Sequence, residues 1–183
     1  MHEHSGGERR GTSLIAMPVV TIQDGRKVGE ITALLVRREE GTVAAVRIGN
    51  QIAPGQAVPY QSLRLVGVDV VLVDSAAALE PSLPTDEVRT LEDGVVGRAV
   101  LTASGERIGS ISDFWVDTAT GRVTAYRVHP EASFLTRLSH LMRHDTFEVP
   151  AEQVQALGVA ALIVNDTVAT DESAAPPSGV KVI

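Results

Sequence analysis

The chain repeats itself, and this internal repeat restricts its fold more than any other feature of its 183 residues. Shifted by 80 positions, residues 24–48 align with residues 104–128 without a gap, and identical glycine, isoleucine, valine, alanine and arginine residues recur along the alignment. Further along, the shift becomes 91, so that Val58-Pro59 aligns with Val149-Pro150. One module is therefore used twice, and the second copy carries an insertion of 11 residues.

Glycines divide each module into short runs rich in valine and isoleucine, which are typical of β-strands. We expect strands over Val28–Val36, Thr42–Ile48, Ile108–Val116 and Arg122–Val128. A glycine with positive φ closes a tight hairpin at little steric cost. We therefore assign structural turns to six glycines that recur in pairs across the repeat: Gly25, Gly29, Gly41, Gly105, Gly109 and Gly121.

Each module continues through Val-Pro into one expected helical turn, because proline suits the first position of a helix. A buried strand then ends each module, over Val68–Val73 and over Val159–Val164. Aromatic residues make up only 3% of the chain, so the core must be built from Val, Leu, Ile and Ala. Several short strands separated by glycine turns predict an all-β fold of two tandem small β-barrels, since closure into a barrel removes exposed sheet edges.

The order of these motifs resembles the PRC-barrel family. Both copies read Asp/Ser-Gly-x-x-Val/Ile-Gly-x-Ile, followed by a turn glycine 12 residues after the second glycine, then Val-Pro, then Gly before an apolar strand. The resemblance covers residues 13–75 and 93–167, and the family includes the cytoplasmic domain of the photosynthetic reaction-centre H subunit and the C-terminal domain of a ribosome-maturation factor. It implies small β-barrels that dock onto larger assemblies and are generally not enzymes. The chain differs from the H subunit in lacking a membrane-spanning helix, and from the maturation factor in carrying a second barrel copy.

The repeat and the composition together define five segments. They are a disordered tail over 1–12, a first PRC-like barrel over 13–75, a linker over 76–91, a second PRC-like barrel over 92–167, and a disordered tail over 168–183. Pro81 and Pro84 disfavour a continuous strand in the linker. The last segment is rich in small and polar residues and in proline, which is typical of disorder.

Composition excludes several classes of function. The absence of cysteine excludes disulfides, thiolate metal sites and a cysteine nucleophile. The net charge of −7 disfavours broad nucleic-acid binding, and we expect no DNA partner. No apolar run approaches the roughly 18–20 residues that span a bilayer. The N-terminus also lacks the apolar stretch of a signal peptide. We therefore expect a cytoplasmic protein, either free or peripheral at the membrane.

The insertion, at about 131–147, breaks the symmetry of the repeat. Its centre reads FLTRLSHLMRH from Phe134, and at helical spacing the apolar residues lie within an arc of about 120°. We expect a short amphipathic helix with a basic polar face. This helix either caps its own barrel or binds a partner protein, an anionic membrane or RNA phosphate. The candidate partner-binding residues are Phe134, Arg137, Leu138, His140, Leu141, Arg143 and His144.

Other candidate sites favour structural roles. His140 and His144 have a workable metal-ligand spacing, but no acidic ligand is implied, so we expect no metal site. Arg47 and Arg127, which are equivalent in the repeat, are expected to pair with a carboxylate such as Glu30 or Asp113. Two larger residues of the second copy, Trp115 and Tyr126, either fill an enlarged core or form a recognition surface.

No catalytic constellation is present in the sequence. The chain has no Gly-rich phosphate loop followed by Lys-Ser/Thr and no nucleophile elbow. We expect no catalytic residues and no cofactor. The favoured function is a non-catalytic adaptor or scaffold that docks on a larger protein complex, with the cytoplasmic membrane face as one location. The alternatives are a module associated with RNA or the ribosome, and a small-ligand sensor with its pocket between the barrels. The sequence leaves the partner and the oligomeric state open.

Overall fold

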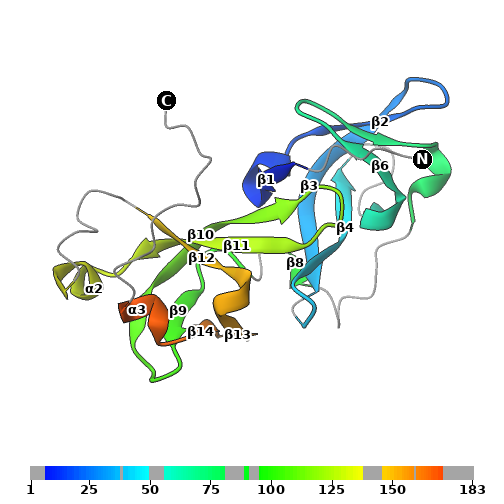
Figure 1. Ribbon diagram of the computed structural model, residues 1–183. Helices are drawn as coiled ribbons and strands as arrows, with labels where there is room; N and C mark the ends of the chain where they lie inside the picture. The colour runs from blue at the N-terminus through cyan, green and yellow to red at the C-terminus, as the bar shows by residue number, and fades with distance from the viewer. Residues whose placement is uncertain are drawn as a thin grey trace.

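The computed structural model of the chain describes residues 7–37, 39–49, 56–80, 89–90, 95–137, 146–158 and 160–170. This part of the chain is mostly β-strand and forms two sheets, which lie side by side (Figure 1). The first module contains β2 (Pro18–Thr21), β3 (Lys27–Arg37), β4 (Thr42–Gly49), β5 (Gln56–Pro59), β6 (Leu63–Val66) and β7 (Val71–Val73). The second contains β9 (Ala99–Thr102), β10 (Arg107–Asp117), β11 (Val123–Pro130), β12 (Phe147–Pro150), β13 (Val154–Leu157) and β14 (Ala161–Val164).

The two sheets have the same topology. The strand order is β5-β4-β3-β2-β7-β6 in the first module and β12-β11-β10-β9-β14-β13 in the second. In both modules the single parallel pair of the path joins the first strand of the module in the chain to its last, β2 to β7 and β9 to β14. The internal repeat is therefore a structural repeat, and the all-β, two-module fold is confirmed.

The expected closure into barrels is not observed. The end strands of each path, β5 and β6 or β12 and β13, are not paired with each other in the described part of the chain. The reason is local: the 3-10 turns η2 (Tyr60–Ser62) and η5 (Ala151–Gln153) join these strands directly and turn the second away from the first. Both turns start immediately after Val-Pro, as the sequence predicts.

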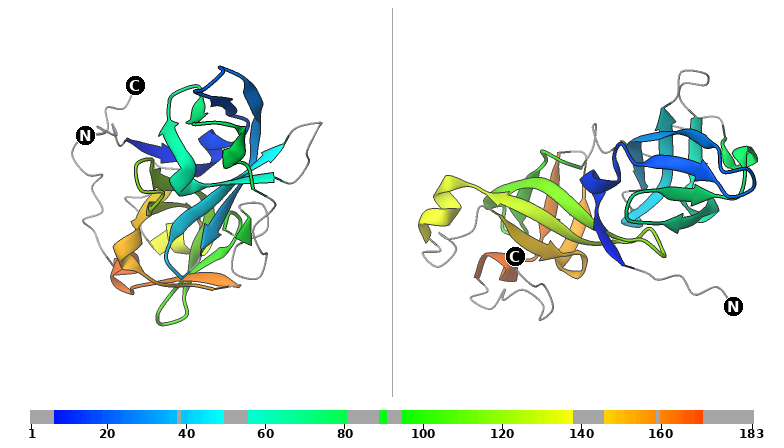
Figure 2. Two further views of the ribbon diagram at one scale, coloured as in Figure 1. Left: turned by 90° about the vertical axis from the view of Figure 1, so that its right-hand side faces the viewer. Right: turned by 90° about the horizontal axis from the view of Figure 1, so that it is seen from above.

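The modules exchange short strands. Strand β1 (Glu8–Arg10) precedes the first module but pairs with β10 of the second, whereas β8 (Arg89–Thr90) precedes the second module but pairs with β3 of the first. The registers are equivalent, since Arg9 lies opposite Val116 and Arg89 lies opposite Val36. Figures 1 and 2 show β1 running between the two sheets. The modules are thus related by an approximate two-fold axis.

Three expected segment boundaries differ from the structure. Residues 7–12, expected in a disordered tail, include β1 and the start of the 3-10 helix η1 (Gly11–Leu14). Leu14 is 1% exposed, so burial of its side chain fixes this segment in place. The expected linker likewise contributes η3 (Ala76–Ala78) and β8, and the short helix α3 (Thr167–Thr170) extends beyond the expected end of the second module. Glu80 of the linker forms a bridge with Ala57 of β5, whereas residues 1–6, 81–88 and 171–183 lie outside the described residues.

Four of the six assigned turn glycines are confirmed. Gly25, Gly41, Gly105 and Gly121 have φ between 60° and 88° and lie between strands. Gly29 and Gly109 lie instead inside β3 and β10, so their assignment to turns is wrong. At Gly109 a side chain would bring Cβ within 2.3 Å of the His129 carbonyl oxygen, which explains why this strand position is glycine.

A single hydrophobic cluster connects the two modules. It includes Ile31, Val46 and Val71 of the first sheet together with Ile111 and Leu162 of the second, all at most 1% exposed. Aliphatic residues dominate it, as the low aromatic content requires. The modules therefore share one core and do not form two separately packed domains.

Candidate docking groove at the module junction

Backbone hydrogen bonds join the two modules at their equivalent turns. The Val43 N–H donates to the Gly121 oxygen at 2.8 Å, and the Val123 N–H donates to the Gly41 oxygen at 2.8 Å. Val43 and Val123 are equivalent in the repeat, and so are the two glycines. The approximate two-fold axis therefore passes through the bridge between Thr42 and Arg122.

The N-terminal segment adds a second set of contacts across the junction. The backbone N–H of Thr12 donates to the Asp113 carboxylate at 3.2 Å, and the Thr12 hydroxyl donates to the same group. Asp113 is only 5% exposed, so the bonds compensate for the burial of its carboxylate. Gly11 lies so close to Phe114 that a Cβ atom would come within 2.6 Å of the ring.

Two equivalent hollows lie beside the junction, one on each side of the axis. Each has one wall from the turn of one module, and another from the strands and 3-10 turn of the other module. The hollow against the first module has a volume of about 550 Å³, and the hollow against the second has a volume of about 1380 Å³. The backbone hydrogen bonds at the junction are therefore symmetric, whereas the volumes of the two hollows differ.

Tyr60 accounts for much of this asymmetry. Its ring lies so close to Gly121 that a Cβ atom there would come within 2.7 Å of it, and its hydroxyl donates to the Thr118 oxygen at 3.1 Å. Burial raises the pKa of Tyr60, and the nearby charge of Asp117 adds to this. The equivalent residue of the second module is Ala151, and a Cβ atom at Gly41 would meet nothing within 4 Å. The larger hollow, which has Ala151 at the position equivalent to Tyr60, is hereafter called the junction groove.

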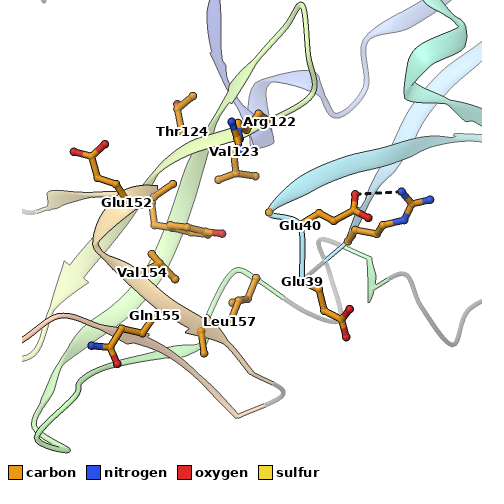
Figure 3. A pocket seen from close by; sticks show the side chains of 14 residues that line it. Glu39, Glu40, Arg122, Val123, Thr124, Glu152, Val154, Gln155 and Leu157 are labelled. Carbon is orange, nitrogen blue, oxygen red and sulfur yellow. Dashed lines mark hydrogen bonds and ion pairs between the residues drawn. The ribbon is translucent and has the colours of Figure 1, made fainter.

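The junction groove has an apolar floor and a charged rim. The floor contains Val123, Tyr126, Val154 and Leu157 of the second module. Tyr126 is 3% exposed, and its burial raises the pKa of its hydroxyl to about 12. Figure 3 shows Val123, Val154 and Leu157 facing the turn that carries Glu39 and Glu40 of the first module.

Charges of both signs stand on the rim. Arg37 pairs with Glu40 at 3.3 Å within the first module. Glu39, Glu152 and Arg122 also line the groove, and none of them has an ion pair among the residues that the structure describes. Among the described residues, two carboxylates and one guanidinium of the groove are therefore without an ion-pair partner.

The side chain of Asp117 stabilises the turn that packs against Tyr60. The Asp117 carboxylate accepts hydrogen bonds from the backbone N–H groups of Thr120, at 2.8 Å, and Ala119, at 2.9 Å. The bond from Thr120 is the main cause that lowers the pKa of Asp117 below its ordinary value. These bonds fix the backbone that packs against Tyr60.

The residues proposed from the sequence as a partner surface lie elsewhere. Helix α2 (Ala132–Arg137) starts in the insertion, and Phe134 is 2% exposed and packs on Phe147 with ring centroids 5.8 Å apart. Phe134 belongs to the core, so its assignment to a partner surface is wrong. Leu138, His140, Leu141, Arg143 and His144 lie outside the described residues, as does the side chain of Arg137.

The two aromatic residues of the second copy that the sequence singled out, Trp115 and Tyr126, lie in different environments. Tyr126 lies in the core, whereas Trp115 donates from Nε1 to Glu148 at 2.8 Å on the outer face. Arg127 pairs with Glu148 at 3.6 Å and lies 5.9 Å from the Trp115 ring centroid. The expected pairing of Arg127 with a neighbouring carboxylate is therefore confirmed, but the carboxylate is Glu148 and not Asp113, which accepts bonds from Thr12.

The junction groove was not predicted from the sequence, although Tyr126 was singled out and a pocket between the modules was left open. The signal that could have found them is the residue after Val-Pro, which is tyrosine in one copy and alanine in the other. Among the described residues there is no cluster of three or more potential metal-binding side chains. None of the described helices is long and apolar enough to cross a membrane.

Comparison with known proteins agrees with the repeat. The family model for the PRC-barrel domain matches the chain twice, over residues 6–80 and 94–169. The two matches cover most of the chain: the first includes strands β1 to β7, and the second includes strands β9 to β14. The chain is a tandem PRC-barrel protein and belongs to that family. A search of curated proteins finds no match.

Proposed function

We propose that this chain is a non-catalytic adaptor that holds a partner protein in the junction groove. The observation that carries the proposal is the asymmetry of the junction: Tyr60 narrows one of two equivalent hollows to about 550 Å³, whereas Ala151 leaves the other at about 1380 Å³. Apolar residues on the floor supply buried contact area, and free charges on the rim supply specificity. This distribution is typical of protein interfaces.

The fold supports the same proposal. Each module contributes one wall, so the groove exists only when the two modules are joined. In this proposal the tandem repeat is required for binding, since one module alone cannot form the groove. In this proposal the partner is part of a larger complex at the cytoplasmic membrane face, and the insertion at about 131–147 provides a second contact with that complex or with the membrane.

A small-ligand sensor is the second candidate, and the volume of the groove favours it. About 1380 Å³ at the boundary between two modules is ample for a small molecule. The groove is, however, open to solvent, whereas small-molecule sites usually enclose most of their ligand. Association with RNA has weaker support, because the groove rim carries more carboxylates than guanidinium groups and the chain has a net charge of −7.

Ala151→Tyr tests the adaptor proposal, because it narrows the junction groove as Tyr60 narrows the other hollow. The tagged full chain is purified from its source cell, and co-purifying proteins are identified separately in the soluble and membrane fractions. Wild type should retain a defined partner complex that Ala151→Tyr loses. Ala103→Tyr, in the exposed turn before β10, is the matched control and should retain it. Identical partners for wild type and Ala151→Tyr would refute docking at the groove.

A further variant separates the two proposed contacts. Leu138→Asp with Leu141→Asp changes the insertion and leaves the groove residues unchanged. Loss of membrane-fraction proteins only from this variant would assign membrane contact to the insertion. Ribosomal proteins among the retained partners would favour the RNA-associated alternative.

A further inference from the structure

The junction groove lies at a gap in the second sheet. Strand β12 covers β11 only from Ala125 to Val128, and before Ala125 the edge of β11 meets the turn of the first module, where the Val123 N–H donates to the Gly41 oxygen. On the other side of the gap is β13, which pairs only with β14 among the described strands. All four residues of β13 line the groove.

Two details show unfilled hydrogen-bonding capacity at this gap. The hydroxyl of Thr124, which also lines the groove, is buried and has no hydrogen-bond partner among the described residues. The edge of β13 opposite β14 pairs with no strand in the described part of the chain. Buried polar groups usually have partners, and an open strand edge is a template for another strand.

From these observations, and resting on the proposed function, we propose that the junction groove binds an extended peptide segment of a partner protein by strand addition to β13. Backbone hydrogen bonds to β13 supply part of the affinity, and alternate side chains of the peptide point to the floor formed by Val123, Val154 and Leu157. The added strand lies in the gap between β11 and β13. It completes the sheet that the 3-10 turn η5 leaves open.

The charges of the rim define the peptide further. Glu39 and Glu152 are free carboxylates, and Arg122 is the free guanidinium group among the described groove residues. Among the described groove residues, the uncompensated charge facing the ligand is therefore negative. The peptide that fits has apolar residues at alternate positions and at least one Lys or Arg between them.

Selection from a random peptide library tests this inference, because it samples many peptide sequences and requires no identified partner. A phage-displayed library of 12-residue peptides is selected on the full-length wild-type chain and counter-selected on Ala151→Tyr. We expect enrichment of peptides with alternating β-branched or aromatic residues and a basic residue. A synthetic copy of an enriched peptide should bind Ala151→Tyr at least about tenfold more weakly than wild type or Ala103→Tyr, because the tyrosine occupies its place.

Two further measurements identify the mode of binding. The backbone amide resonances of residues 154–157 should shift on addition of the peptide, as strand addition requires. Glu39→Gln with Glu152→Gln should weaken binding several-fold and reduce its dependence on salt. Failure to enrich any peptide over the Ala151→Tyr protein, or shifts confined to other strands, would overturn the inference. The adaptor proposal would survive that result if wild type still retained a cellular partner that Ala151→Tyr loses.

Discussion

At the scale of single residues, the junction depends on two turn glycines in almost the same backbone conformation. Gly41 and Gly121 have φ of 60° and 73°, and each accepts a hydrogen bond from a valine of the other module. They differ in surroundings, since only Gly121 lies against a tyrosine ring. Comparison of substitutions at these two glycines therefore distinguishes the free-energy cost of backbone strain from that of a steric clash.

Substitution of each glycine by alanine measures these two costs. Gly41→Ala should destabilise the protein by about 1 kcal/mol, because alanine is strained at positive φ. Gly121→Ala should cost about 1–3 kcal/mol more, since its Cβ would lie 2.7 Å from the Tyr60 ring. Urea unfolding of both variants gives the two free energies. Equal losses would show that Tyr60 does not pack against this turn as described.

The two tyrosines of the chain also predict how stability depends on pH. Burial raises the pKa of Tyr126 to about 12 and raises that of Tyr60 as well. In the unfolded chain both groups ionise near pH 10. Because the folded pKa values are higher, the stability they contribute is present below about pH 10 and is lost as the pH rises toward 12.

We therefore expect the free energy of unfolding to fall above about pH 10, with tyrosinate absorbance appearing together with unfolding. Tyr60→Phe should lower stability at neutral pH by about 1 kcal/mol, through loss of the bond to Thr118, and should weaken the alkaline dependence. Absorbance titration beside circular dichroism checks this. Tyrosinate absorbance that rises near pH 10 in a fully folded protein would contradict it.

At the scale of elements, local signals in the sequence predicted most of the fold. The long hairpins β3–β4 and β10–β11 join strands that are adjacent in the chain, and their glycine turns recur in both copies. Strands β1 and β8 were missed, because two or three residues show no periodicity and their partners are distant in the sequence. The groove was missed for a related reason, since it is formed by both modules and no segment of the sequence contains it.

The contact that fastens the N-terminal segment gives an element-scale prediction. Asp113→Ala should destabilise the protein by about 1–3 kcal/mol, because the backbone N–H groups of Thr12 and Phe114 lose their acceptor. In a double-mutant cycle with Thr12→Ala, the coupling energy should be about 1 kcal/mol. Additive effects within experimental error would indicate that this segment is not held on β10.

At the scale of the whole molecule, the shared core predicts that the two modules unfold together. The single tryptophan, Trp115, lies in the second module, so its fluorescence reports that module only. Circular dichroism reports the strands of both modules. The two urea unfolding curves should coincide, as they do for a single cooperative unit. A fluorescence transition at a clearly different urea concentration would show that the modules unfold independently.

The groove and the strand exchange are two consequences of the same arrangement. Each module supplies a strand to the other, and this places the turn of the first module opposite β13 of the second. Docking in the junction groove therefore requires that the modules remain associated. The arrangement of the two modules is the structural basis of the proposed function.

Cleavage between the modules is the most direct test of this account. A specific protease site is placed within residues 82–87 of the full chain, the purified protein is cut, and its mass is measured by size-exclusion chromatography with light scattering. The account predicts that the two parts elute together with the mass of the uncut chain, because hydrogen bonds, exchanged strands and a shared core hold them. Two separate, folded species would contradict it.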